Sequence, residues 1–264
     1  MTQFVTSADG TRIAYQTLGQ GPALVLVDGA LCYRASGPAM PLAETLKDRF
    51  AVTVYDRRGR GESGDTSPYA VDREIEDLQA VIAAVGPEAF VYGISSGAAL
   101  ALEAAERTPA IRRLFVYEAP FIVNDSRRLP AGYIETMHAL ARADDRAGML
   151  RHFMRNGVGM PGFVVLIMQL MPIWKTLKTV APTLAYDTAL TGTFQQGKPI
   201  APGRWSHLTQ PAMVVGGSKS DPWMRNAQKA IAAALPHARH GELAGENHMV
   251  KPAAIAPMIT AFFS

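Results

Sequence analysis

The sequence predicts an α/β fold: a mostly parallel, doubly wound sheet of about eight strands, interrupted by an inserted helical cap. Three observations predict it. Short, continuous apolar runs at 23–27 and 51–55 alternate with helical patterns, as buried parallel strands do. A further run at 89–92 passes through a tight glycine turn directly into a strong helix former at 98–105. The alternation then stops for about 85 residues and resumes near residue 212.

Each element has its own signal in the order of the chain. Asp9-Gly10 is a typical turn dipeptide and predicts a hairpin over 4–16 at one edge of the sheet. The other expected elements are strand 23–27, helix 38–49, strand 51–55, helix 72–85, strand 89–92, a helix to about 107, strand 111–117, strand 212–216, helix 223–235, a short edge strand at 238–243 and a helix over 252–263.

The interrupting segment contains no buried strand pattern and is rich in methionine. It is broken by Pro130, Pro161, Pro172 and Pro182, which separate several short helices. We therefore divide the chain into a core region 1–120, a helical cap 121–206 and a second core region 207–264. Because ligands of parallel sheets bind beyond the carboxyl ends of the strands, the cap is expected to roof that edge.

Composition narrows the class of protein. Hydrophobic residues make up 48% and charged residues 19% of the chain, which suits a buried core. The net charge is +3 and the basic residues are scattered, so no nucleic-acid surface is expected. The apolar stretch 163–171 is too short to span a bilayer, and no secretory signal is visible at the start. We expect a cytoplasmic protein with no membrane partner; the sequence does not indicate its oligomeric state.

The organising motif is Gly93-Ile94-Ser95-Ser96-Gly97, between the apolar run and the helix. A serine at the apex of such a turn needs a strained backbone, and side chains at either glycine would collide with neighbouring elements. The amide of Ser96, at the start of the helix, points to where an oxyanion forms. The motif predicts a serine nucleophile at Ser95; the alternative is a glycine-rich structural turn.

A nucleophilic serine needs an imidazole base and a carboxylate that orients it. His248 lies in the loop before the last helix, where it can reach Ser95. We predict Asp221, directly after a buried strand, as the acid, although helix N-capping is an alternative role. Glu118, at the end of the preceding strand, is the alternative acid, and Asp187 in the cap is a third candidate.

With these residues in order, the chain resembles the α/β-hydrolase superfamily over nearly its whole length. The order Ser95, Asp221, His248 matches the family's nucleophile, acid and base. The run 56–63 resembles the family's Asp-x-x-Gly-x-Gly-x-Ser loop, which supports the nucleophile turn. The resemblance also implies a second oxyanion donor, the amide of Ala30, in a loop where many members have His-Gly and this chain has Asp28-Gly29.

These features predict a serine hydrolase that cleaves an ester or related acyl bond of a small to medium, largely apolar substrate in a methionine-rich pocket. The same triad also serves lactonases, carbon–carbon hydrolases and perhydrolases. The alternative from another class is a catalytically silent hydrolase fold that binds a hydrophobic small molecule. We expect no cofactor and no metal site, and assign no chemistry to the lone Cys32.

Overall fold

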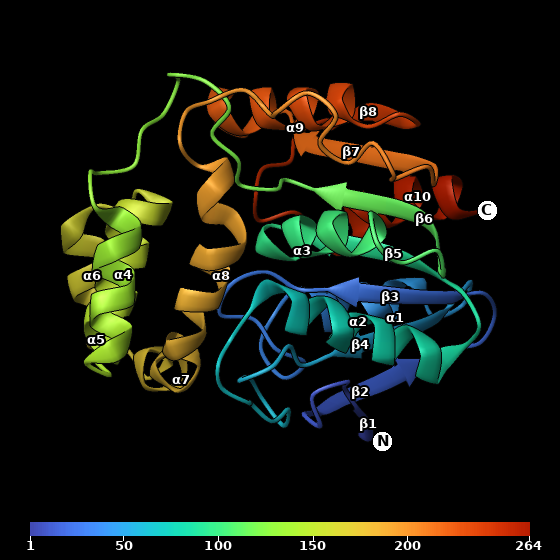
Figure 1. Ribbon diagram of the computed structural model, residues 1–264, viewed down its shortest axis with the longest axis horizontal. Coiled ribbons are helices and arrows are strands. Elements are labelled where there is room, and N and C mark those ends of the chain that lie inside the picture. The colour runs from blue at the N-terminus through green and yellow to red at the C-terminus, as the bar shows by residue number, and fades with distance from the viewer.

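A single eight-stranded sheet forms the centre of the protein, which a computed structural model describes over residues 1–264 (Figure 1). The strands are β1 (Gln3–Thr6), β2 (Arg12–Leu18), β3 (Ala23–Val27), β4 (Ala51–Tyr55), β5 (Ala89–Ile94), β6 (Ile111–Tyr117), β7 (Ala212–Gly217) and β8 (Ala238–Leu243). Their order is β1-β2-β4-β3-β5-β6-β7-β8. β1–β2 and β2–β4 are antiparallel, and every other neighbouring pair is parallel. The predicted mostly parallel sheet is confirmed.

The two edges of the sheet are the ones that the sequence predicts. The β1–β2 hairpin closes through Gly10, which has a positive φ of 86° that glycine adopts without strain. The carboxylate of Asp9 accepts a hydrogen bond from the amide of Thr11 at 3.0 Å and stabilises the turn. At the other edge, β8 pairs only with β7.

Helices cover both faces of the sheet, as a doubly wound fold requires. They are α1 (Ala39–Leu46), α2 (Val71–Val85), α3 (Ser96–Ala105), α9 (Pro222–Ala234) and α10 (Pro252–Phe263). On one face, α2, α3 and α9 contribute to a core of 32 buried residues. On the other face, α1 and α10 contribute to a core of 19. Most of this apolar surface is fully removed from water, which is the main stabilising contribution to such a fold.

All the elements between β6 and β7 are helical, which confirms the predicted insertion. They are α4 (Tyr133–Arg142), α5 (Arg146–His152), the π-helical turn η1 (Phe153–Val158), α6 (Gly162–Gln169), α7 (Ile173–Val180), the 3₁₀ turn η2 (Ala181–Thr183), α8 (Leu184–Thr191) and the 3₁₀ turn η3 (Gly192–Phe194). In Figure 1 they lie on the side to which the arrowheads of β3, β6 and β7 point, with α8 between the sheet and the other cap helices. The cap therefore stands beside the carboxyl ends of the strands.

The cap has a small core of its own. Met137, Met149 and Met154 pack there with Trp174, and all four are buried. The two ends of the insertion instead join the core of the body, where the rings of Phe121 and Phe194 stack with centroids 4.3 Å apart. The limits 121 and 206 of the cap stay a prediction, since the outer parts of this segment pack on the body.

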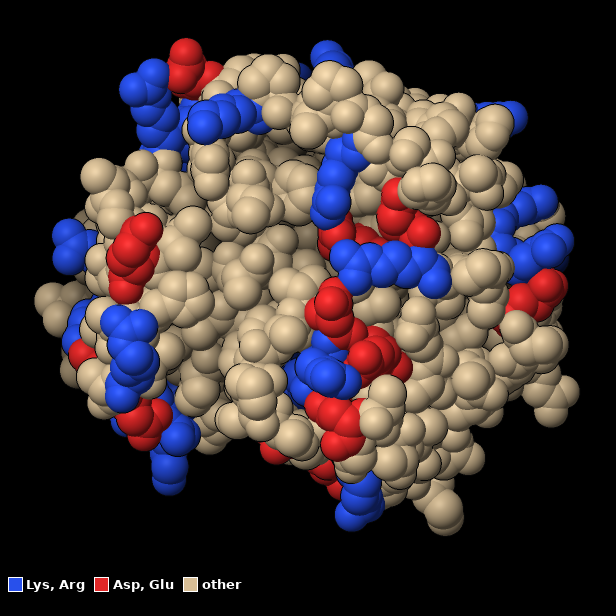
Figure 2. All heavy atoms as spheres, in the orientation of Figure 1, with Lys and Arg blue, Asp and Glu red and all other residues tan.

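The surface is mixed in charge. The face in Figure 2 carries basic and acidic side chains side by side, without a continuous basic area. No single helix is both long and apolar enough to cross a membrane. Taken together, the helical segments Gly162–Gln169 and Ile173–Phe194 are long and apolar enough for a membrane span, but they meet at an angle of 99°.

Candidate active site

Ser95 occupies the apex of a sharp turn between β5 and α3, as the motif predicts. Its backbone has φ 57° and ψ −128°, a conformation that non-glycine residues rarely adopt. The flanking glycines are required by close backbone contacts. A Cβ on Gly97 would lie 2.2 Å from the carbonyl oxygen of Val27, and one on Gly93 would lie 2.6 Å from that of Gly97. The turn thus holds a strained serine between tightly packed elements.

The loop after β3 passes directly against this serine. A Cβ on Gly29 would lie 2.9 Å from the Cβ of Ser95, so only glycine lets the loop approach this closely. The next residue, Ala30, lines the same cavity as Ser95 and Ser96. Ser96 is the first residue of α3, where backbone N–H groups have no intrahelical acceptor. Both amides proposed as oxyanion donors therefore lie beside the serine, and their role stays a prediction.

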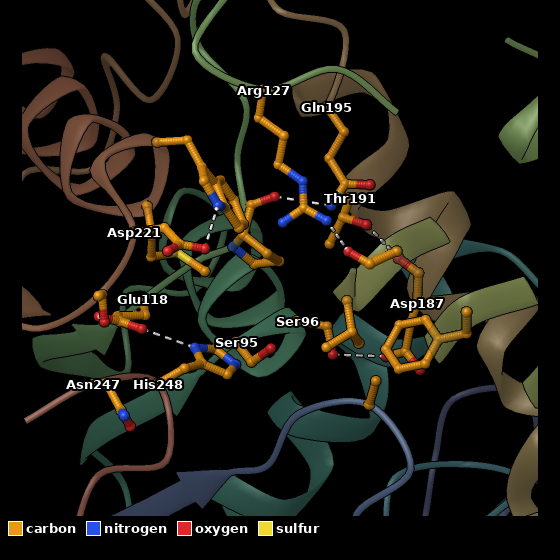
Figure 3. A pocket seen from close by; sticks show the side chains of 18 of the residues that line it. Ser95, Ser96, Glu118, Arg127, Asp187, Thr191, Gln195, Asp221, Asn247 and His248 are labelled. Atoms are coloured by element: carbon orange, nitrogen blue, oxygen red, sulfur yellow. Dashed lines mark hydrogen bonds and ion pairs between the residues drawn. The ribbon is translucent and has the colours of Figure 1, made fainter. Parts of the chain in front are cut away.

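His248 and Glu118 form the hydrogen-bonded pair next to Ser95 (Figure 3). Nδ1 of His248 lies 2.9 Å from Oε2 of Glu118. The ring of His248 lies between the carboxylate and the hydroxyl of Ser95, which places Nε2 on the serine side. The Glu118 side chain is 0% exposed and the His248 side chain 41% exposed. Nε2 and Ser95 Oγ are not hydrogen-bonded here; such contacts often tighten only in the substrate complex.

Glu118 is held from two further directions. Its Oε1 accepts hydrogen bonds from the Gly217 amide at 2.7 Å and from the Ser220 hydroxyl at 2.5 Å. Its own backbone has φ 50°, a conformation that non-glycine residues rarely adopt. With Oε1 occupied in this way, Oε2 is left for His248, and the carboxylate is fixed in one orientation.

Asp221, the acid expected from the sequence, is not brought to His248. It lies four residues beyond the last residue of β7, is exposed, and lines the same cavity as Ser95. Its Oδ2 accepts a hydrogen bond from Trp223 Nε1 at 3.2 Å. It stands at the N-cap position of α9 without making a side-chain capping bond. The geometry corrects the pairing to Glu118, the alternative acid. Glu118 follows β6 immediately, whereas the turn after β7 carries Asp221 away.

The loop that carries His248 is anchored to the ends of β6 and β7. The hydroxyl of Tyr117 donates to the carbonyl of Asn247 at 2.7 Å, and the amide of Lys219 donates to the carbonyl of Glu246 at 2.9 Å. A Cβ on Gly217 would lie 2.4 Å from that same carbonyl oxygen, so the two loops touch through backbone. The imidazole is therefore positioned by fixed main-chain contacts.

The Asp56–Ser63 loop supports the serine turn through buried arginines. Arg57 pairs with Glu74 at 2.6 Å and with Asp187 of α8 at 2.9 Å. Its Nη1 also donates to the Ser96 hydroxyl at 3.2 Å and to the carbonyl of Asp28 at 3.3 Å. One guanidinium thus joins the loop after β3, the start of α3 and the cap.

Arg60 makes a second connection of the same kind. Its Nη1 donates to the carbonyl of Gly29 at 2.6 Å, and its Nη2 pairs with Asp187 at 2.8 Å. Burial raises the pKa of Asp187, but the charges of Arg60 and Arg57 outweigh that effect and hold it below its usual value. The carboxylate stays ionised at neutral pH. Asp187, considered in the sequence as a third candidate acid, is therefore committed to these two arginines and to Ser96 Oγ at 2.7 Å.

The carboxyl group of Asp28 is turned away from Ser95. Its Oδ2 accepts a hydrogen bond from the amide of Ala39, at the start of α1, at 3.4 Å, and Oδ1 is buried without a partner. Burial raises the pKa of Asp28 to about 7. The side chain of Asp28 therefore does not line the cavity that contains Ser95.

Ser95 and His248 open into a cavity of about 360 Å³. Of its 22 lining residues only 7 are hydrophobic, and the two methionines among them, Met224 and Met249, come from outside the cap. The methionines that the sequence predicts for the pocket do not come from the cap, because Met137, Met149 and Met154 pack in the cap core. Within the structure no cluster of three or more histidine, cysteine or carboxylate side chains is placed to hold a metal ion.

Sequence reasoning missed the polar cap residues that face this cavity. The cap contributes Arg127, Tyr133, Thr188, Thr191 and Gln195 (Figure 3 labels three of them). The sequence carries only a weak signal for these polar residues. Arg127 forms part of an Arg-Arg pair that is typical of a solvated surface, and the threonines lie in a helix without a chemical motif.

Comparisons with known proteins agree with this architecture. A model of the Alpha/beta hydrolase family matches residues 21–257. The chain is 30% identical over 121 residues to Uncharacterized hydrolase YraK of Bacillus subtilis (strain 168), a match that spans 43% of this chain and 43% of that protein's length.

Solved structures extend the likeness to the whole chain. An alpha/beta hydrolase from Sphaerobacter thermophilus DSM 20745 is 45% identical with a TM-score of 0.90, covering 99% of this chain and 100% of its own. The esterase RhEst1 from Rhodococcus sp. ECU1013 shares the fold at 19% identity and a TM-score of 0.69, covering 99% of this chain and 98% of its own. The extent of the family match and the turn that holds Ser95 lead to one assignment: this chain belongs to the alpha/beta hydrolase family.

Proposed function

We propose that the protein is a serine hydrolase that cleaves an ester or related acyl bond of a small molecule. Ser95 is the nucleophile, His248 the general base and acid, and Glu118 the carboxylate that orients the imidazole. The amides of Ala30 and Ser96 stabilise the oxyanion. The cavity of about 360 Å³ suits a small-molecule substrate.

The reaction proceeds in two acyl-transfer steps. His248 Nε2 takes the proton of the Ser95 hydroxyl as its oxygen attacks the carbonyl carbon, and the carbonyl oxygen becomes an oxyanion. Collapse of this intermediate breaks the bond to the leaving alcohol, which takes the proton from His248. A water molecule, deprotonated by the same nitrogen, then attacks the acyl-enzyme and releases the carboxylic acid and the free serine.

The observation that carries this proposal is the hydrogen bond between Glu118 and His248 beside a serine in a strained turn. Glu118 fixes the proton on Nδ1, so Nε2 faces Ser95 as an acceptor. A loop histidine bound only to water has no need of a fully buried carboxylate. The close approach of Gly29 to Ser95 adds support, because it brings the loop amides to the side where the oxyanion forms.

A panel of nitrophenyl esters of increasing acyl length tests the proposal. The wild-type protein is expected to hydrolyse at least one ester, and Ser95→Ala and His248→Ala are expected to lose turnover by at least 10³-fold. Ser206→Ala and His237→Ala are matched controls, since both residues are exposed and outside the cavity. Full turnover in Ser95→Ala contradicts the proposal.

Two observations support the hydrolase over a silent binding protein. The Asp28 carboxyl group binds the start of α1 instead of facing the oxyanion position, and His248 has a carboxylate partner. Within the hydrolases, lactone, carbon–carbon and perhydrolase chemistry use the same residues. Adding a lactone and hydrogen peroxide to the substrate panel separates these activities from simple ester hydrolysis.

A further inference from the structure

One guanidinium group in the cavity has no carboxylate partner. Arg127 lies between β6 and α4 and lines the cavity that contains Ser95. The four fully or largely buried arginines elsewhere each pair with a carboxylate at 3.1 Å or less: Arg34, Arg57, Arg58 and Arg60. Arg127 forms no ion pair, and its contacts are a carbonyl and an aromatic ring. It is the one arginine in the cavity lining, and it is unpaired.

Those two contacts fix the guanidinium in place. Its Nη2 donates to the carbonyl of Gly157 in the cap, and its Cζ lies 4.2 Å from the centre of the Trp223 ring. Figure 3 shows the group extending into the pocket, between the side of Asp221 and the side of Thr191 and Gln195. Its remaining N–H groups have no protein acceptor and face the cavity.

The environment of Arg127 favours an anion from outside the chain. Burial lowers the pKa of Arg127, which means that the cation is less stable there than in water. Asp221 opposes this effect with its charge but stays beyond ion-pair distance, with Oδ2 bound to Trp223. A partly desolvated cation is costly unless it is paired, and a bound anion removes that cost.

A second hydrogen-bond donor, the hydroxyl of Tyr133, lies beside Gly157, whose carbonyl binds Arg127. A Cβ on Gly157 would lie 2.6 Å from the hydroxyl oxygen of Tyr133, so this hydroxyl is adjacent to the residue that binds Arg127. Tyr133 lines the cavity, and its hydroxyl makes no hydrogen bond within the chain. Burial raises its pKa to about 12, so it remains protonated and able to donate. Lys219, exposed at the rim, adds a positive charge near the entrance.

We propose that Arg127 and Tyr133 form a carboxylate-binding subsite, and that the substrate is an ester or related acyl compound with a second, free carboxylate. The planar guanidinium and the hydroxyl match the oxygens of a carboxylate. This inference rests on the proposed hydrolase function of the same cavity, and it replaces the largely apolar substrate with an anionic one.

A matched pair of substrates tests it. Monoethyl adipate and ethyl adipamate differ only in whether the distal group is a carboxylate or a neutral amide. The wild-type protein is expected to show a kcat/KM at least tenfold higher for the acid than for the amide. Monoethyl succinate and monoethyl glutarate locate the subsite by chain length. Equal kcat/KM for acid and amide at all lengths overturns the inference.

Variants connect the preference to the residues. Arg127→Gln is expected to lower the acid-to-amide ratio by at least tenfold, Tyr133→Phe to lower it less, and Arg127→Lys to keep part of it. Arg128→Gln is the matched control, because this neighbour is exposed and pairs with Asp125 at 2.6 Å outside the cavity. An unchanged ratio in Arg127→Gln, or in both other cavity variants if that one does not fold, contradicts the subsite.

Two readouts separate this inference from the proposed function. Loss of ethyl adipamate hydrolysis in Ser95→Ala supports the hydrolase, whatever the acid preference. Calorimetric titration with glutarate needs no turnover, and its affinity is expected to fall at least tenfold in Arg127→Gln and not in Arg128→Gln. Absence of glutarate binding at millimolar concentration overturns the subsite and leaves the hydrolase proposal standing.

Discussion

Arg60 Nη1 donates to the carbonyl of Gly29 at 2.6 Å, a contact that ties the proposed oxyanion loop to the Asp56–Ser63 loop. The same guanidinium pairs with Asp187 in cap helix α8. The loop conformation beside Ser95 therefore depends on the cap as well as on the sheet. The cap contributes to the site in two ways, since it lines the cavity and also braces the loop below it.

Removal of the charge of Asp187 is expected to weaken this brace. Asp187→Asn keeps the shape but leaves Arg57 and Arg60 short of one buried negative charge, so we expect a loss of about 3–5 kcal/mol in the free energy of unfolding. Urea unfolding measures it. Asp125→Asn, an exposed ion-pair partner, is the control and is expected to change stability by less than about 1 kcal/mol. Equal stability of Asp187→Asn and the wild type contradicts the prediction.

The assignment of the acid predicts unequal effects for two carboxylates. Glu118→Gln presents an amide to His248 and favours the wrong tautomer, so kcat is expected to fall by about 10²–10⁴-fold. Asp221→Asn is expected to lower kcat less than tenfold, because Asp221 does not contact the imidazole. Both rates are measured on the best ester of the nitrophenyl panel. The reverse order of effects returns Asp221 to the role of acid.

The serine turn tolerates no side chain at Gly97. Gly97→Ala places a Cβ 2.2 Å from the Val27 carbonyl and 2.6 Å from that of Asp28, both backbone atoms. We expect destabilisation by about 3 kcal/mol or more, measured by thermal unfolding. Gly162→Ala is the control, since its Cβ would meet nothing closer than 3.6 Å and lies in a helix. It is expected to leave stability equal or slightly higher.

Asp28 makes stability depend on pH. Its pKa is about 7 in the folded protein against 3.8 for the unperturbed group, so between these values the folded state holds a proton that the unfolded chain has released. The free energy of unfolding therefore falls as the pH rises through this window, by at most about 4 kcal/mol.

Asp28→Asn removes that loss, because the amide carries no charge at any pH in this range. The melting temperature of the variant relative to the wild type is expected to rise from pH 4 to pH 8 and then level off. Melting curves at several pH values measure it. A constant difference across the range shows that the carboxyl group does not titrate as its burial implies.

The parts predictable from sequence were those fixed by local pattern. Strand and helix limits followed from apolar runs, and the Gly-x-Ser-x-Gly pattern identified the strained turn. The contacts that require glycine are local at Gly93, whereas at Gly97 they come from Val27 and Asp28, far away in the sequence. The carboxylate that pairs with His248 was harder to predict. Glu118 and Asp221 both follow buried strands, and only the positive φ of Glu118 and the length of the turn after β7 decide which one reaches His248.

The cavity lining could not be predicted because it depends on packing across the cap. Methionines at helical spacing can either pack in the cap core or line the cavity. Composition does not show which of the two they do. Arg127 and Asp187 acquire their environments from segments far apart in sequence. The pairing of Asp187 with Arg57 joins residues 130 positions apart.

The most direct test of the catalytic account is the site of fluorophosphonate labelling, read by peptide mass spectrometry. The reagent reacts with a serine whose proton is taken by a neighbouring base. We predict a single covalent adduct on Ser95, formed rapidly in the wild type and at least 10²-fold more slowly in His248→Ala. An unlabelled Ser95 in folded protein, or an adduct that forms equally fast without His248, would contradict it.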